Sequence, residues 1–96
     1  PGDGIYATWA TVNQHTYQSA TSIGIRPTFG LTERVVEAHI LDFDQNIYGE
    51  HITVQFVEKI RDQETFDNLP ALITQIAEDV SKARIILKDH GGSNFA

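Results

Sequence analysis

Hydrophobic and polar residues alternate along the first two thirds of the chain, in short segments rich in β-branched and aromatic side chains. Such alternation places every second side chain on one face of a strand, which is typical of a half-buried β-sheet. The first segment reads GIYATWATV, and the third places Glu37 and His39 on one face with apolar neighbours. The pattern predicts four strands, over residues 4–12, 17–25, 35–43 and 51–60.

Turn-forming residues separate these segments. Asn13-Gln14-His15 is predicted to be a hairpin turn, and Asp44-Gln45-Asn46 turns the chain again. Residues 26–34, which contain Pro27 and Gly30, are predicted to form a loop. Because the connections are short, the strands are expected to pair antiparallel.

After Phe66 the spacing of the apolar residues changes to three and four, which predicts a helix. The stripe consists of Leu69, Leu72, Ile73, Ile76, Val80, Ala83 and Leu87. Asp67 or Asn68 can cap the helix, and Gly91-Gly92-Ser93 is predicted to end it. We expect one domain over 1–90 with a flexible tail over 91–96, built as an antiparallel sheet or barrel covered by the C-terminal helix.

The composition restricts the class of protein. The chain has 96 residues, 41% of them hydrophobic and 21% charged, which suits a single globular domain. The net charge of −6 and seven scattered basic residues argue against a nucleic-acid partner. No apolar run approaches the roughly 18 residues of a membrane span, and the absence of cysteine fits a cytoplasmic protein. Because the sequence contains no methionine and begins Pro1-Gly2, we expect it to be a piece of a longer protein.

Several kinds of site are not supported by the residues. Residues 42–46 (DFDQN) imitate the start of a calcium loop, but Ile47 and Thr53 stand where glycine and glutamate are needed. The histidines do not share a metal-binding helical spacing, so no zinc site is predicted. They are His15, His39, His51 and His90. Neither a G-x-S-x-G elbow nor a phosphate-binding glycine loop is present.

The remaining candidate is Glu37, a carboxylate between Val36 and Ala38 in an apolar strand. Burying it without a partner is costly, so it either has a function or is a solvated residue at a sheet edge. The second alternative is the more common one for a strand glutamate. His39, on the same face, either holds Glu37 by a hydrogen bond or packs at the sheet edge.

Six short motifs follow one another over about residues 4 to 84. They are GIYA (4–7), SIGIRPTFG (22–30), VEAHILDF (36–43), IYGEHITVQF (47–56), IRDQETFDNLPAL (60–72), and the helix motif with Gln75-Ile76, Asp79 and Ala83-Arg84. In order and spacing they resemble the riboflavin kinase (flavokinase) domain of bacterial bifunctional riboflavin kinase/FAD synthetases.

The resemblance implies an antiparallel Greek-key β-barrel, mainly β, with one C-terminal α-helix. It implies transfer of the ATP γ-phosphate to the 5′-hydroxyl of riboflavin, giving FMN, with Mg²⁺ as the metal. Glu37 would be the catalytic base, and Arg61 and Glu64 would bind the flavin. The implied nucleotide contacts are Leu41, Phe43 and Tyr48.

The chain departs from the family in one respect. The family's G-x-P-T-A-N motif, whose Thr and Asn help to bind magnesium and the ATP phosphates, has no counterpart before Gly4. We therefore expect no metal ligand within this chain and little or no activity from the chain alone. The parent protein could carry an N-terminal FMN adenylyltransferase domain. The alternative is a non-catalytic flavin-binding or structural remnant of a riboflavin kinase, and the sequence encoded upstream of Pro1 would distinguish the two.

Overall fold

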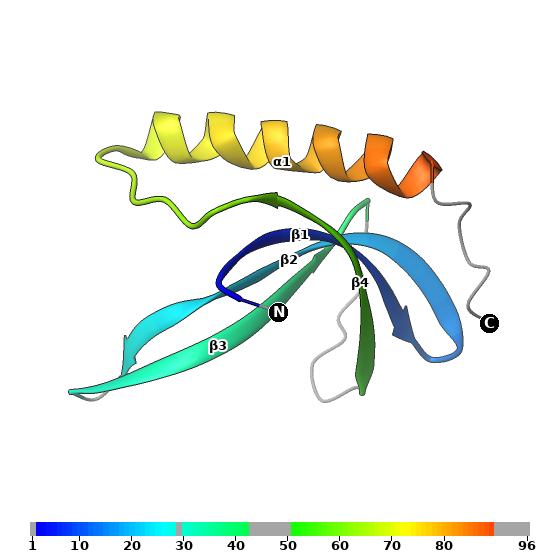
Figure 1. The fold of residues 1–96 in the computed structure, drawn as a ribbon, viewed down its shortest axis with the longest axis horizontal. Helices are drawn as coiled ribbons and strands as arrows, with labels where there is room; N and C mark the ends of the chain where they lie inside the picture. The colour runs from blue at the N-terminus through cyan, green and yellow to red at the C-terminus, as the bar shows by residue number, and fades with distance from the viewer. Residues whose placement is uncertain (1, 29, 43–50, 90–96) are drawn as a thin grey trace.

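The computed structural model describes residues 2–28, 30–42 and 51–89. Within these ranges the chain forms four strands and then one helix that crosses above the sheet (Figure 1). The elements are β1 (Gly4–Val12), β2 (His15–Thr28), β3 (Leu31–Ile40), β4 (Ile52–Arg61) and α1 (Leu69–Asp89). No described helix is long and apolar enough to cross a membrane.

The described strands form one antiparallel sheet in the order β3-β2-β1-β4. Three strands connected by hairpins, with the fourth returning beside the first, define a Greek key. The predicted antiparallel arrangement and the C-terminal helix are confirmed. Among the described residues β3 and β4 are the end strands of a strongly twisted sheet, each paired with one neighbour (Figure 1).

The loop predicted over residues 26–34 is wrong, because β2 and β3 continue through it as a long hairpin with only residues 29 and 30 between them. Gly30 has φ 78°, a left-handed conformation that glycine adopts without strain. Pro27 is tolerated because the pairing of β1 with β2 stops at Gly4 and Ile23, so among the described strands β2 has only β3 beside it at Pro27.

The other predicted boundaries are shifted. The turn between β1 and β2 consists of Asn13 and Gln14, both with positive φ, and His15 already belongs to β2. The third strand was predicted over 35–43, but β3 starts at Leu31 and ends at Ile40. Asp42, with φ 56°, turns the chain away. The predicted turn at 44–46 and the tail at 91–96 lie outside the described residues.

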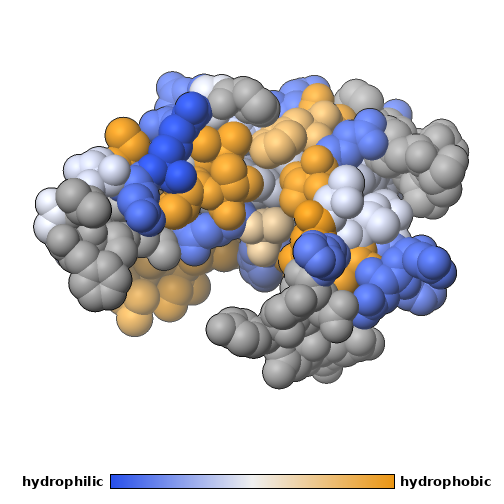
Figure 2. Space-filling model, turned by 90° about the horizontal axis from the view of Figure 1, so that it is seen from below, coloured by the Kyte–Doolittle hydropathy of each residue, from blue (hydrophilic) through white to orange (hydrophobic). Residues whose placement is uncertain are grey.

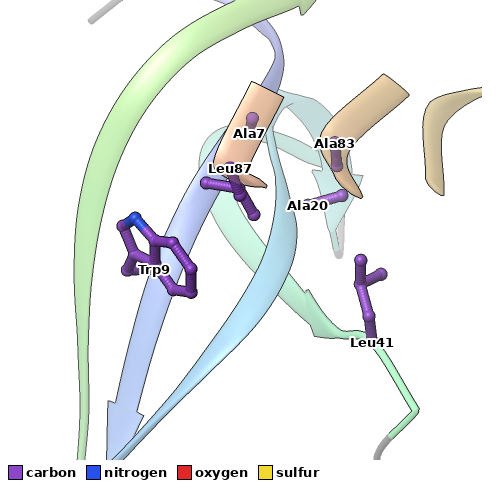
Figure 3. Close-up of a cluster of buried hydrophobic side chains, with 6 residues drawn as sticks. All are labelled: Ala7, Trp9, Ala20, Leu41, Ala83 and Leu87. Carbon is purple, nitrogen blue, oxygen red and sulfur yellow. The ribbon is translucent and has the colours of Figure 1, made fainter. Parts of the chain in front are cut away.

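The main core lies between α1 and the face of the sheet that α1 covers (Figure 3). Ala83 and Leu87 of α1 are fully buried there. The sheet contributes Ala7, Trp9 and Ala20, and Leu41 joins them just after the end of β3. Only the C-terminal half of the predicted stripe packs fully, since Leu69 and Ile73 are 65% and 57% exposed.

The opposite face of the sheet contains buried polar and apolar side chains. Thr8, Ser19 and Thr21 are fully buried, and their hydroxyl groups bond to one another, with Thr8 and Thr21 2.8 Å apart. Tyr6 and Phe56 pack edge to face beside them at 5.2 Å. Figure 2 views the molecule from the side away from α1 and shows several groups of apolar residues there, with hydrophilic residues between and beside them.

Two contacts at its ends fix α1. The Asn68 side-chain oxygen accepts the amide proton of Ala71 at 2.8 Å, so Asn68 rather than Asp67 caps the helix. Near the other end Arg84 donates to Asp42, just after β3, at 2.9 Å. The hydrogen bond and the charge of Arg84 lower the pKa of Asp42.

Candidate functional site

Two adjoining hollows lie between the sheet, the N-terminal half of α1 and the residues that connect β4 to α1. These connecting residues, 62–68, are called the β4–α1 segment. The larger hollow has a volume of about 500 Å³ and the smaller about 310 Å³. Both are lined by Ser22, Glu37, Gln63 and Glu64, so they form one cleft.

Strand register places Glu37 at the centre of this cleft. Ile5 lies opposite Ser22, and Ser22 lies opposite Glu37, so the three side chains form one row across β1, β2 and β3. Glu37 is exposed to solvent, as a strand glutamate usually is, and it also lines both hollows. It avoids the cost of burial because its row faces the hollow instead of the core.

Arg61, the last residue of β4, is held by a bidentate ion pair with Asp79 of α1. Its Nε and Nη2 donate to the two carboxylate oxygens at 2.9 and 2.8 Å, and the two side chains are 14% and 8% exposed. The hydrogen bonds and charge of Asp79 raise the pKa of Arg61, partial burial opposes this, and the charge of Glu64 adds to the rise. Gln75 donates to the same carboxylate at 3.1 Å.

Arg61 also anchors the β4–α1 segment. Its Nη1 donates to the carbonyl oxygen of Asp62 at 2.9 Å, and its guanidinium carbon lies 5.8 Å from the centre of the Phe66 ring. Because a guanidinium is rigid and planar, these contacts fix the start of the segment and the position of Phe66 together. Both Arg61 and Phe66 line the larger hollow.

Apolar side chains form most of the remaining wall of the larger hollow. They are Ile5, Ala20, Ala38, Phe66, Leu72, Ile76 and Val80. The smaller hollow is mainly polar and adds Asp3 and Thr65. An apolar cavity with a few fixed polar groups is the usual form of a small-molecule site.

The structure brings three of the predicted site residues together. Glu37, Arg61 and Glu64 all line the larger hollow, as does His39. Leu41, predicted to contact a nucleotide, is instead packed in the core with 6% exposure and does not line either hollow. Phe43 and Tyr48 lie outside the described residues.

Two residues with evident roles in the cleft were not predicted as site residues. Asp79 belongs to a matched motif. It is a polar residue on an apolar helical stripe, which was a usable signal in the sequence, and the structure shows that it is buried. Gln63 gave no signal, because its partners are far away in the sequence. Among residues 2–28, 30–42 and 51–89 there is no group of three or more potential His, Cys, Asp or Glu metal ligands.

The fold and the cleft together define a Greek-key module with a small-molecule site. The family model for riboflavin kinase (Flavokinase) matches residues 1–87. The chain therefore belongs to the riboflavin kinase family, as the six motifs predicted.

Individual relatives agree with this assignment. The chain is 39% identical over 80 residues to the RNA-binding riboflavin kinase of Bacillus subtilis, covering 82% of this chain and 35% of that protein. It is 34% identical over 87 residues to the bifunctional riboflavin kinase/FMN adenylyltransferase of Pseudomonas fluorescens, covering 90% and 28%. Human riboflavin kinase is 35% identical over 91 residues, covering 91% and 59%. The chain thus spans about a third or less of the two bacterial relatives.

A solved structure shares the fold. A crystal structure of a protein from Streptococcus pneumoniae, described as a macrolide-efflux protein, superimposes with a TM-score of 0.80 at 34% identity. The match covers 88% of this chain and 28% of that one.

Proposed function

We propose that this chain provides the flavin-binding cleft and the catalytic base of a riboflavin kinase, which transfers the γ-phosphate of ATP to the 5′-hydroxyl of riboflavin. The products are FMN and ADP. The observation that carries the proposal is that Glu37, Arg61 and Glu64 line one cleft with a mainly apolar wall. The family match explains why these residue types occur together.

Glu37 is assigned as the general base. In phosphoryl transfer the protein mainly positions the reactants, neutralises charge and accepts the proton of the attacking hydroxyl. An exposed carboxylate at the centre of the cleft can accept that proton from a hydroxyl brought within hydrogen-bond distance. The apolar wall suits the isoalloxazine ring, with Arg61 and Glu64 at its polar edge.

Fewer residues of this chain are assigned to binding the nucleotide than to binding the flavin. Family membership implies ATP. Phe43 and Tyr48 remain the proposed nucleotide contacts, whereas Leu41 packs in the core and is not assigned to the nucleotide. Mg²⁺, when bound, would neutralise phosphate charge, but the described residues form no cluster of ligands for it and none is assigned to it. One relative is named as RNA-binding. For this chain the net charge of −6 still favours small-molecule partners over nucleic acid. The proposed cytoplasmic location rests on the absence of cysteine.

The test is Glu37→Gln in the complete gene product, with FMN formation measured from riboflavin, ATP and Mg²⁺. The substitution retains size but removes the base, so kcat should fall about 10²–10⁴-fold. The KM for riboflavin should change much less, because the lost interaction belongs to the transition state.

The matched control is Glu33→Gln, which removes the same charge from another exposed position on β3 and should leave kcat unchanged. Normal turnover by folded Glu37→Gln protein would refute the assignment of the base. Riboflavin binding by the wild-type protein without FMN formation would instead support the non-catalytic alternative.

A further inference from the structure

We propose that Gln63 is a positioning residue that fixes the β4–α1 segment across the cleft and so sets where Glu64 and Phe66 stand relative to Glu37. The inference takes its ligand, riboflavin, from the proposed function. The contact that carries it is independent of any ligand.

The carboxamide of Gln63 reaches from the segment to β2. Its Nε2 donates to the Ser22 hydroxyl oxygen at 2.7 Å and to the carbonyl oxygen of Ile23 at 3.0 Å. A carboxamide nitrogen has two protons, so both are used on adjacent residues of one strand, and the orientation of the group is fixed. Ser22 is the direct cross-strand neighbour of Glu37, so the contact lies beside the proposed base.

Gly24 makes room for this contact. A Cβ added there would lie 3.0 Å from Gln63 Nε2 and 3.3 Å from its Cδ, closer than ordinary van der Waals contact. The backbone of Gly24 does not have a left-handed φ, so its conformation does not require glycine. The absence of a side chain at residue 24 therefore serves the approach of Gln63.

Three separate contacts anchor the segment. Arg61 is fixed at the start by a largely buried ion pair with Asp79, and Asn68 caps α1 at the end. Gln63 is an exposed, uncharged residue near the start of the segment, and its bonds to β2 hold the segment just before Glu64. Glu64 and Phe66 follow Gln63 in the chain and line the cleft, so releasing Gln63 displaces binding groups while leaving Glu37 in place.

The test uses Gln63→Ala, Gly24→Ala and the double variant in the complete gene product. Each single variant should raise the riboflavin KM by about 3- to 10-fold, the value of one lost hydrogen-bonding contact. The kcat should stay within about twofold, because the base is untouched. The double variant should be no worse than Gln63→Ala alone, since the three atoms nearest to the new methyl group all belong to the Gln63 side chain that alanine removes.

Gln55→Ala is the matched control, since Gln55 is exposed on β4 and does not line the cleft. Gln63→Glu keeps the size of the side chain but removes both protons, and it should raise the KM in the same way. Additive effects in the double variant, a wild-type KM for Gln63→Glu, or a fall in kcat with unchanged KM would each overturn the proposal.

A second measurement separates this proposal from the proposed function. Amide hydrogen exchange over residues 62–68, without ligand, should be faster in Gln63→Ala than in Gln55→Ala. Equal exchange in the two variants would overturn the role of Gln63 even if FMN is formed. Faster exchange with no FMN formation by the wild-type protein would overturn only the choice of reaction.

Discussion

The polar residues of the cleft differ in how firmly they are held. Arg61 and Asp79 satisfy each other's charge and hydrogen bonds in a largely buried pair, and Gln75 adds a further bond to the carboxylate. Glu37 and Glu64 are exposed. The ion pair thus builds the wall of the cleft, while the two glutamates remain accessible to a ligand.

Asp79→Asn should test the structural share of this network. Asparagine offers one acceptor instead of two and leaves the Arg61 charge without its partner in a site that is only 14% exposed. The free energy of unfolding should fall by about 1.5–3 kcal/mol, the range for hydrogen bonds to charged groups.

Chemical denaturation measures this change. Glu78→Gln, which removes a charge from an exposed position on the same helix, is the control and should alter stability by less than about 0.5 kcal/mol. Equal stability of Asp79→Asn and Glu78→Gln would mean that the ion pair contributes nothing net, as some buried pairs do.

Among single residues, the sequence motifs pointed to Glu37, Arg61 and Glu64, and the structure brings these three together in one cleft. They could not identify Gln63, because its hydrogen bonds join residues that are about forty positions apart. Nor could they show that Glu37 is exposed, since the same alternation fits a strand that faces the core and one that faces a cleft. Leu41 was selected from its position in a motif, and that position did not reveal that its side chain packs in the core.

Among the elements, the turn between β1 and β2 carries avoidable strain. Asn13 and Gln14 have φ values of 51° and 69°, the left-handed pair that a two-residue hairpin turn of type I′ requires. Asparagine tolerates this conformation, but glutamine does not favour it.

Gln14→Gly should therefore stabilise the protein, by about 1 kcal/mol, because glycine adopts a left-handed conformation without the steric cost. Asn13→Gly is the control and should give a smaller gain. Thermal unfolding of the three proteins measures the order. A loss of stability in Gln14→Gly would show that the glutamine side chain stabilises the turn in some other way.

Periodicity predicted every element but misplaced several ends. Pro27 and Gly30 suggested a loop because each usually interrupts a strand. In the structure Gly30 belongs to the short turn, while Pro27 lies where β2 has a described partner on one side only. Both exceptions depend on how far the neighbouring strand extends, which is a property of the sheet and not of the local sequence.

At the scale of the whole molecule, the two end strands are where we expect the 96-residue chain to associate with other chains. Within the described sheet β3 and β4 each pair on one side only. Val36 of β3 is 59% exposed and lines an apolar hollow of about 260 Å³ with Ile23 and Phe56. Such strands recruit other chains, so the 96-residue chain should self-associate as its concentration rises.

Val36→Lys should weaken this association, because a charge on an end strand opposes edge-to-edge pairing. Ile73→Lys is the control, since Ile73 is 57% exposed on α1 and does not line this hollow, and it should have no effect. Sedimentation velocity over a concentration series gives the measurement. A strict monomer up to about millimolar concentration would contradict the prediction.

The position of β1 between β2 and β4 has a consequence for the order in which the cleft is built. β2 reaches β1 through a two-residue turn, whereas β4 arrives from far along the sequence and pairs Arg61 with Ile5. Long-range pairing is slow, because loop entropy is lost before the contacts repay it. Arg61 both completes that pairing and anchors the cleft, so the cleft exists only in chains whose last strand has docked. A ligand that fills the cleft therefore binds the finished fold alone, and it stabilises the protein increasingly as its concentration rises above its Kd.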